Sequence, residues 1–429
     1  MDKKHLWWMG CFLACFLIGA AGCRKPSSVP VDEKGRTQPQ GEVGATPGTI
    51  QISTPEVRCV KLGEQQEAPS AVCIQGYPLV FTGQVFAEGR DATQDGFDAE
   101  IKLAWTRLEA VLEKAGSQKE KIVRLNFCIS QESDAAQVVG FVRQQFTKDW
   151  LPAISMVVTP LPREKARVAF DAVAYVEEKA ADLTRVRLSD EAVTPSDAVV
   201  SPPGGLVFFS GQPDKNPLPA AAENAMKALL ETAENLHVEK RDILQIRVFL
   251  QPVSEASTVL KVLQQVFPEG TMPPVVFTEW IASAPVEIEM IARLPQQAVS
   301  GSDLVRFWNP PGVKASPTFS RVTIVQTDRL IFFPGFLSRK DGSGQEQVDD
   351  IFAQLTAGLS LTGSDLQHLA KATYYVVDKE ASDAMDAVRK TLYAPDRPPA
   401  ASKVTIHGVG QAGRTVSMDM IAVPAAGPG

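Results

Sequence analysis

The sequence predicts an α+β protein made of three tandem copies of one unit. A hydrophobic strand that ends in a glycine-containing turn occurs three times, and its glycines lie 128 and 124 residues apart: LVFTGQ (79–84), LVFFSGQ (206–212) and LIFFPGF (330–336). An amphipathic helix, a strand and a second helix follow each turn, and two further strands close each copy. Two helices among several strands predict a mixed sheet with both helices on one face.

The individual elements recur in the same order in every copy. Apolar residues at spacings of three and four predict a first helix at 98–115, 222–235 and 348–361. The next strand is expected at 122–129, 243–250 and 369–377, and the second helix at 135–146, 256–267 and 381–392. A strand led by proline begins at Pro152, Pro273 and Pro399, and the closing strands lie at 168–174, 286–292 and 416–423.

Composition limits the possible functions. The 429 residues are 44% hydrophobic and 22% charged, which is ordinary globular composition. A net charge of −7 disfavours broad attraction to nucleic acid or anionic lipid. The four histidines are scattered, and neither an H-E-x-x-H motif nor paired C-x-x-C motifs occur. We therefore predict no metal site, no cofactor and no nucleic-acid partner.

The N-terminus predicts an export signal. After Asp2-Lys3-Lys4, residues 6–21 form the apolar run LWWMGCFLACFLIGAA, which is shorter than the roughly 20 residues of a membrane-spanning helix. The run ends in AAGC (20–23), which resembles a bacterial lipobox whose cysteine is lipidated after cleavage. We predict a lipoprotein signal peptide at 1–22 and lipidation of Cys23, which places the protein in the cell envelope outside the cytoplasm. A short membrane anchor or a signal without lipid is the alternative.

The remaining chain divides into a tether and three domains. Residues 23–55 are rich in Pro, Gly, Ser and charge and predict a flexible tether. The three copies are expected at 56–178, 183–296 and 302–425. Cys59, Cys73 and Cys128 allow one disulfide at most, and a Cys59–Cys73 pair across a hairpin is one possibility.

Several short motifs resemble those of the Rid proteins (RidA/YjgF type, often labelled L-PSP endoribonuclease). They are LEKAG (112–116), PAIS (152–155), SGQ (210–212) and VEIEMIA (286–292). The resemblance covers about residues 56–425, three times over, and implies a chorismate-mutase-like fold that assembles as a trimer with clefts between subunits. It implies here an intramolecular pseudo-trimer that is monomeric, in which three apolar sheet faces close on one another. Fusion removes the concentration dependence of assembly.

The resemblance also implies which residues line the clefts. Rid clefts hydrolyse enamines and imines and hold a substrate carboxylate with an arginine, but Ile154, Val275 and Ala401 occupy the matching positions here. The family's pocket glutamate matches Glu287, and the first residue of its S-G-Q turn matches Ser210. These two are the only catalytic candidates. Gln84 and Gln212 match the turn glutamine and are expected to line clefts.

Because an apolar side chain cannot pair a buried carboxylate, we predict clefts that bind a small organic acid, an apolar ligand or a partner without catalysis. Lys403 lies two residues after Ala401, on the same face of its strand, and could supply a cation; a solvated lysine is the alternative. Arg163 is expected to face solvent. The alternative functions are an imine deaminase with an altered substrate and a purely structural envelope protein. Cleavage of RNA is disfavoured, because lysines 114, 119 and 121 alternate with glutamates.

Overall fold

The structure is a computed structural model that describes residues 49–63, 69–88, 96–147, 149–189 and 194–425. The chain divides into two units, residues 1–45 and 46–429, and only the second contains described residues. The predicted signal peptide 1–22, Cys23 and most of the predicted tether 23–55 lie outside the described residues. Ser53, inside the predicted tether, already bonds to the folded unit: its backbone N–H and its hydroxyl both donate to Asp328.

Unit 46–429 contains three mixed sheets of one design. The first sheet has the order β5 (Ala153–Val158), β4 (Ile122–Ile129), β6 (Val168–Tyr175), β3 (Leu79–Thr82), β8 (Ala198–Ser201) and β7 (Thr184–Val186). The second is β11 (Val275–Glu279), β10 (Ile243–Leu250), β12 (Val286–Arg293), β9 (Leu206–Asp214), β14 (Val322–Val325) and β13 (Val305–Trp308). The third is β18 (Ala400–Thr405), β17 (Leu369–Val376), β19 (Val416–Ala422), β15 (Leu330–Phe332), β2 (Ser70–Gln75) and β1 (Glu56–Lys61), with β16 (Phe336–Leu337) also paired to β19. The prediction of three α+β copies is confirmed.

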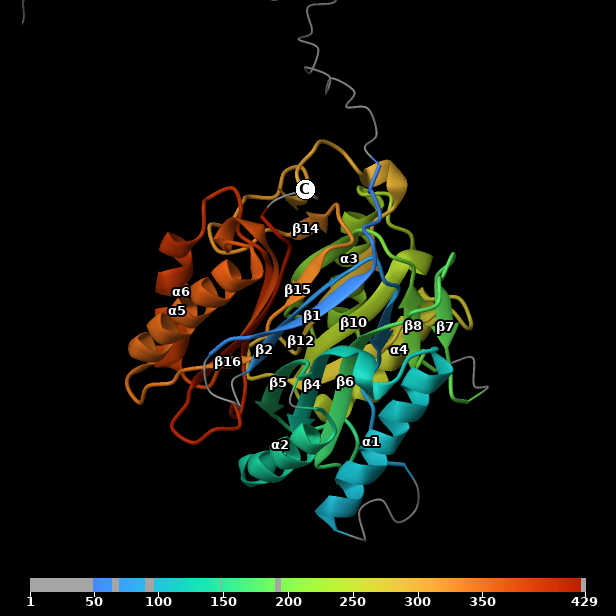
Figure 1. Cartoon of the computed structure of the whole chain (residues 1–429). Coiled ribbons are helices and arrows are strands. Elements are labelled where there is room, and N and C mark those ends of the chain that lie inside the picture. Colours follow the sequence, from blue (N-terminus) through green and yellow to red (C-terminus); the bar gives the residue numbers. More distant parts are fainter. Residues whose placement is uncertain (1–48, 64–68, 89–95, 148, 190–193, 426–429) are drawn as a thin grey trace, which may run out of the picture. The chain divides into compact units, whose positions relative to one another are not determined.

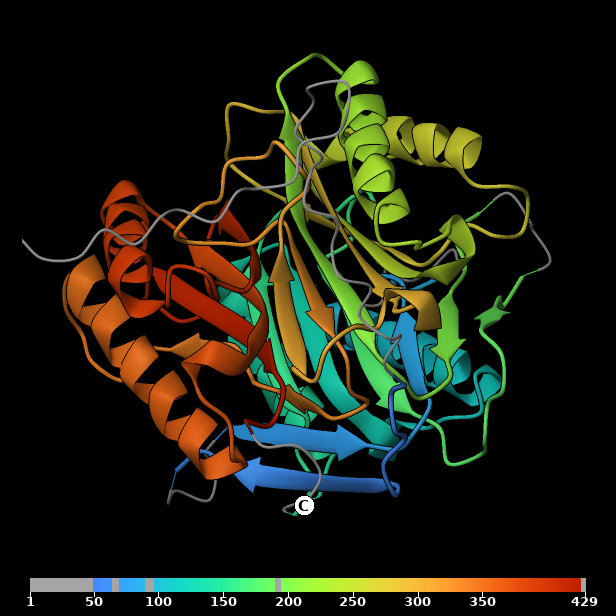
Figure 2. The same ribbon diagram turned by 90° about the horizontal axis from the view of Figure 1, so that it is seen from above.

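Two helices pack on the outer face of each sheet (Figures 1 and 2). They are α1 (Phe97–Lys114) and α2 (Ala135–Gln144), then α3 (Ala220–Glu234) and α4 (Ala256–Val266), then α5 (Gly344–Thr362) and α6 (Lys379–Leu392). Each first helix buries one apolar stripe, as Ile101, Trp105 and Leu108 do in α1, and forms a core with its own sheet. The six predicted helices are thus confirmed to within a few residues at their ends.

The strand pairing shows an exchange of hairpins between copies. The hairpin β7–β8 follows the first copy in sequence, yet β8 pairs with β3 in the first sheet. In the same way β13–β14 completes the second sheet through β9. The hairpin β1–β2 at the start of the chain completes the third sheet through β15, where Cys73 lies opposite Ile331. The sheets therefore cross the predicted domain limits, and the first hairpin closes the cycle.

The inner faces of the three sheets meet in alternating apolar and charged layers. One apolar cluster contains Val123, Leu244 and Ala370 from the three equivalent strands, and another contains Cys128, Phe249 and Tyr375 from the same strands. Between them lies an inner charge ring, in which a cation from each copy pairs with an acid of another copy: Arg124 with Asp419 (2.6 Å), Arg247 with Asp171 (3.1 Å) and Lys371 with Glu289 (2.5 Å). The expectation of wholly apolar inner faces is therefore wrong in the middle layer.

The three described cysteines are unpaired. Cys59 lies opposite Val72, whereas Cys73 lies opposite Arg58, so the two thiols point to opposite faces of the hairpin. A Cys59–Cys73 disulfide is therefore wrong. Burial raises the pKa of Cys73 to about 11 and that of Cys128 to about 12, which leaves both as thiols at neutral pH.

Candidate functional site

The glycine turn of one copy meets the proline-led strand of another at three seams, here called the first, second and third clefts; the first and third contain described cavities. In the first cleft the Gln84 N–H donates to the carbonyl of Val275 (3.1 Å), and in the third the Gly335 N–H donates to the carbonyl of Ile154 (2.8 Å). In the second cleft the Ala401 N–H donates to the Ser210 hydroxyl (2.7 Å). Ile154, Val275 and Ala401 therefore each lie beside the glycine turn of another copy.

The first cleft contains a cavity of about 370 Å³. The side-chain amide of Gln84 makes two hydrogen bonds to the backbone of Phe277, one as donor (3.0 Å) and one as acceptor (3.1 Å), so both of its polar atoms are used by the protein. Arg163 lines this cavity, lies 5.2 Å from the centre of the Phe86 ring and donates to the carbonyl of Ala87. Its side chain is 46% exposed, so Arg163 faces solvent, as expected, while it also lines the cavity.

The second cleft holds most of the polar groups that the sequence singled out. The Ser210 hydroxyl donates to the carbonyl of Ser320 (2.6 Å) while it accepts from Ala401, so it joins β9 to the loop before β14 and to β18. The Glu287 carboxylate lies against Gly211, where a Cβ atom would be 1.9 Å from Glu287 Oε1. A side chain at Gly211 would therefore force the Glu287 carboxylate to move.

Glu287 is a buried carboxyl with an unusual pKa. It is 9% exposed, and burial raises its pKa to about 7. A hydrogen bond from Ser402 opposes the shift, the neighbouring charge of Glu289 adds to it, and Lys371 and Arg321 lower it. The group can thus exchange a proton near neutral pH, as a general acid or base requires.

Arg321 is a cleft residue that the sequence analysis missed. Its Nη1 lies 3.3 Å from Gln212 Oε1, and its guanidinium lies 5.3 Å from the centre of the Phe319 ring. It comes directly before β14, and the strand registers put Ala198 at the same position in the first cleft. Only the exchange of hairpins brings it to the second cleft, so no motif in the sequence could indicate it.

Lys403 is held by a helix of its own copy. Its ammonium lies 2.6 Å from Asp386 Oδ2 and donates to the Ser382 hydroxyl (2.8 Å), both on α6. The side chain therefore shares the face of Ala401, as expected, but its charge is already paired.

The third cleft is more apolar than the first. Its cavity of about 380 Å³ is lined mainly by hydrophobic side chains: Phe127, Val139, Ile154, Met156, Leu337 and Val409. Ser70 also lines it; this residue is 1% exposed, and its hydroxyl has no hydrogen-bond partner within the described part of the chain. Arg143, Gln411 and Ser417 also line the cavity, so its wall is mostly apolar with a few polar groups, of which the Ser70 hydroxyl is unsatisfied.

A metal-binding cluster and a membrane-spanning helix are both absent from the described residues. These residues contain no cluster of His, Cys, Asp and Glu side chains suited to holding a metal ion. None of their helices has the length and apolar character needed to cross a membrane.

The fold and the three clefts define a class of protein, and comparison of the sequence with family models identifies the family. The family model described as Endoribonuclease L-PSP matches residues 67–176 and 313–424, which together make up just over half of the chain. The chain therefore belongs to this family. The two matched regions fall in the first and third copies.

Among solved structures, a YjgF-family protein from Neisseria meningitidis, NMB1025, shares 23% identity, with 29% of this chain and 97% of that chain covered and a TM-score of 0.22. The Rid-family protein YyfB from Yersinia pestis shares 19% identity, with 28% of this chain and 99% of that chain covered and a TM-score of 0.26. TdcF from E. coli, solved with bound serine, shares 16% identity, with 22% and 81% covered and a TM-score of 0.21. No curated protein matches the sequence.

Proposed function

We propose that this chain is a ligand-binding member of its family, whose third cleft holds a small, mainly apolar molecule without catalysis. The observation that carries the proposal is the apolar cavity of about 380 Å³, in which Ile154 stands where the family holds a carboxylate with arginine. Its volume falls in the range of small-molecule pockets, about 300–1,000 Å³. The buried Ser70 hydroxyl supplies one hydrogen bond, so the ligand carries one polar group.

The polar side chains of the clefts already form hydrogen bonds or ion pairs within the protein, which favours binding over catalysis. Gln84 uses its amide on Phe277, Ser210 uses its hydroxyl on Ser320 and Ala401, and Lys403 is paired with Asp386. A substrate that needed these groups would first have to break hydrogen bonds inside the protein, at a cost of about 1 kcal/mol or more for each.

The test is a thermal-shift and calorimetric screen of the full chain with small apolar compounds that carry one polar group, beginning with indole and benzyl alcohol. Ile154→Trp should fill the third cleft and abolish binding, and Ser70→Ala should weaken it about five- to tenfold. Ile281→Trp, at a position that is 47% exposed, is the control and should leave binding unchanged. Binding that survives Ile154→Trp would contradict the proposed site.

A second candidate function, hydrolysis of imines with an altered substrate class, is favoured by the second cleft. Glu287 titrates near neutrality, and Arg321 supplies a guanidinium close to Gln212. The arginine arrives from a different strand than in the family pattern, so a substrate anion would be held in a different orientation.

An amino acid oxidase that generates 2-imino acids in the presence of the full chain tests this candidate. Faster loss of imine that disappears in both Glu287→Gln and Arg321→Met would establish hydrolysis in the second cleft. Lys403→Ala serves as the comparison, because its pairing with Asp386 predicts little effect. If the wild type does not accelerate imine loss, the binding proposal stands and the hydrolase is rejected.

We further propose that the protein is lipid-anchored through Cys23, faces the outside of the cytoplasm and acts as a monomer. The lipobox-like AAGC supports the anchor, and the use of all three inner sheet faces within one chain supports the monomer. Mass spectrometry of the exported protein should show an acylated N-terminal cysteine, and Cys23→Ala should release the protein from membranes. A retained, unprocessed signal run in the wild type would contradict the anchor.

A further inference from the structure

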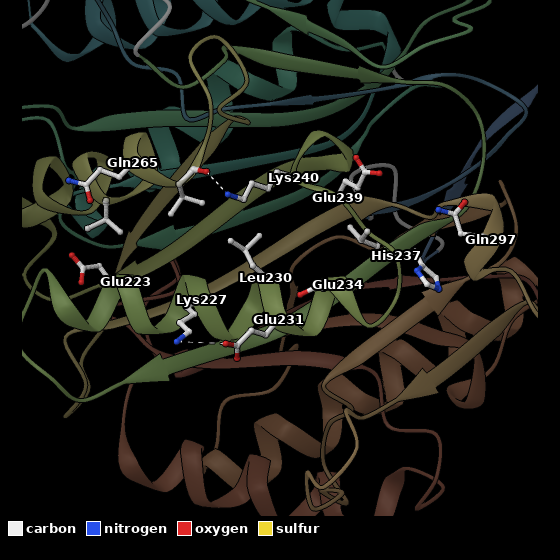
Figure 3. A pocket seen from close by; sticks show the side chains of 13 residues that line it. Glu223, Lys227, Leu230, Glu231, Glu234, His237, Glu239, Lys240, Gln265 and Gln297 are labelled. Carbon is white, nitrogen blue, oxygen red and sulfur yellow. Dashed lines mark hydrogen bonds and ion pairs between the residues drawn. The ribbon is translucent and has the colours of Figure 1, made fainter. Parts of the chain in front are cut away.

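The outer helices of the second copy leave an open groove that the clefts do not explain. It lies between α3 and α4, has a volume of about 760 Å³ and is here called the outer groove (Figure 3). Leu230, Val262 and Val266 form its apolar floor, and Glu223 and Glu234 stand on α3 beside it. The groove faces away from the inner charge ring and from all three clefts, so the proposed function does not use it.

The equivalent space in the first copy is filled. There Trp105 on α1 packs edge-on against Phe141 on α2, with ring centres 6.0 Å apart. The first two copies can be aligned on the residue with positive φ that follows each first helix, because Gly116 lies six residues before β4 and His237 lies six residues before β10. In this alignment Met226 is equivalent to Trp105, and Val262 is equivalent to Phe141. Two smaller side chains at the same two positions leave the helices of the second copy with an unfilled groove.

Some of the charged side chains beside the groove are paired within the protein, and others are not. Lys227 lies 3.9 Å from Glu231, Lys240 donates to the carbonyl of Val266, and Glu239 pairs with Arg241. Within the described part of the chain, the side-chain carboxylates of Glu223 and Glu234 form no hydrogen bond or ion pair. They are eleven residues apart, about three turns, so they lie on the same side of α3 and about 16 Å apart along its axis.

We propose that the outer groove is a docking site for a basic, amphipathic helical segment of a partner protein. An apolar stripe on such a helix would cover Leu230, Val262 and Val266, as in other helix-in-groove interfaces. Two lysines or arginines about three turns apart would pair with Glu223 and Glu234. Such a helix is complementary to the groove. Its positive charges match the two unpaired carboxylates, and its apolar stripe matches the apolar floor.

The test uses fluorescence anisotropy of the full chain with a labelled 18-residue synthetic helical peptide. The peptide has leucines at spacings of three and four and two lysines eleven residues apart. Glu223→Gln with Glu234→Gln should weaken binding at least tenfold, without loss of folding, because both carboxylates are exposed. Glu113→Gln, the equivalent of Glu234 in the first copy, is the matched control and should leave binding unchanged.

A second variant tests the apolar floor. Val262→Phe introduces the aromatic residue that the first copy has at this position and should also abolish peptide binding. Equal binding of a peptide with glutamates in place of the lysines would overturn the proposal, and so would equal losses in the Glu113 control. Self-association of the chain that Glu223→Gln with Glu234→Gln abolishes would also overturn it, because the occupant would then be a second copy.

Discussion

At the scale of single residues, the molecule places charge where the sequence predicted only apolar contact. The six members of the inner charge ring are each at most 9% exposed. Burial alone would lower the pKa of Arg247, but Asp171 and its other acidic neighbours raise it well above its ordinary value. Such pairs are costly to break, because the partner that remains is a buried, unpaired charge.

Arg124→Met should therefore destabilise the fold strongly. It leaves Asp419, which is 1% exposed, without its cation, and a loss of about 3–5 kcal/mol in unfolding free energy is expected. Urea denaturation measures the change. Arg241→Met, which removes an exposed pair with Glu239, is the control and should cost less than about 1 kcal/mol. Similar losses of unfolding free energy in both variants would show that the inner charge ring contributes no more to stability than an exposed ion pair does.

Glu287 predicts a pH dependence with a definite sign. Its pKa is raised to about 7 in the folded state from 4.5, so the folded protein binds the proton more tightly than the unfolded chain does. The resulting stabilisation is complete below pH 4.5 and is lost as the pH rises through 7. Glu287→Gln should remove this pH dependence. The unfolding free energy of the variant relative to the wild type should therefore increase by a few kcal/mol from pH 5 to pH 8. Denaturation curves at both pH values check this, and parallel curves would contradict it.

At the scale of elements, the three first helices end in the same way with different residues. Gly116 (φ +76°) and Gly363 (φ +75°) adopt the left-handed conformation after α1 and α5, as expected for helix ends. The second copy has His237 at this point, with φ +56°. A side chain with a Cβ is strained in this conformation, so the helix is correctly terminated but at some cost in energy.

His237→Gly should accordingly stabilise the protein by roughly 0.5–1 kcal/mol, because glycine adopts the left-handed conformation without strain. Gly363→Ala should destabilise it by a similar amount and is the reciprocal control. Thermal or urea denaturation measures both changes. A destabilised His237→Gly variant would indicate that the imidazole makes contacts worth more than the strain.

At the scale of the whole folded unit, the exchange of hairpins joins the three copies into one compact unit. The third sheet is complete only when β1 and β2 return from the start of the chain to pair with β15. The Asp328 carboxylate strengthens this closure by accepting hydrogen bonds from Ser53 and from the Gly76 N–H. The clefts depend on the same closure, since Ser70 at the start of β2 lines the third cleft.

A disulfide can test the closure directly. Ile331→Cys places a second thiol opposite Cys73 on an antiparallel neighbour, at a spacing that disulfide geometry allows. Mild oxidation should form an intramolecular bond within a monomer, seen as the loss of two free thiols. Leu361→Cys, at a position that is 58% exposed, should not react in this way and is the control. Disulfide-linked dimers from Ile331→Cys would mean that the hairpin pairs with another chain.

The sequence by itself determined the three copies and the order of their helices and strands, and it predicted that Ile154, Val275 and Ala401 stand in place of an arginine. Periodicity and motif position are local properties, so each could be found within one short segment. Only the tertiary structure decided which hairpin completes which sheet, that Arg321 enters the second cleft, and that Lys403 pairs with Asp386. It also decided the inner charge ring, because its paired residues come from different copies and meet only when the three sheets pack together.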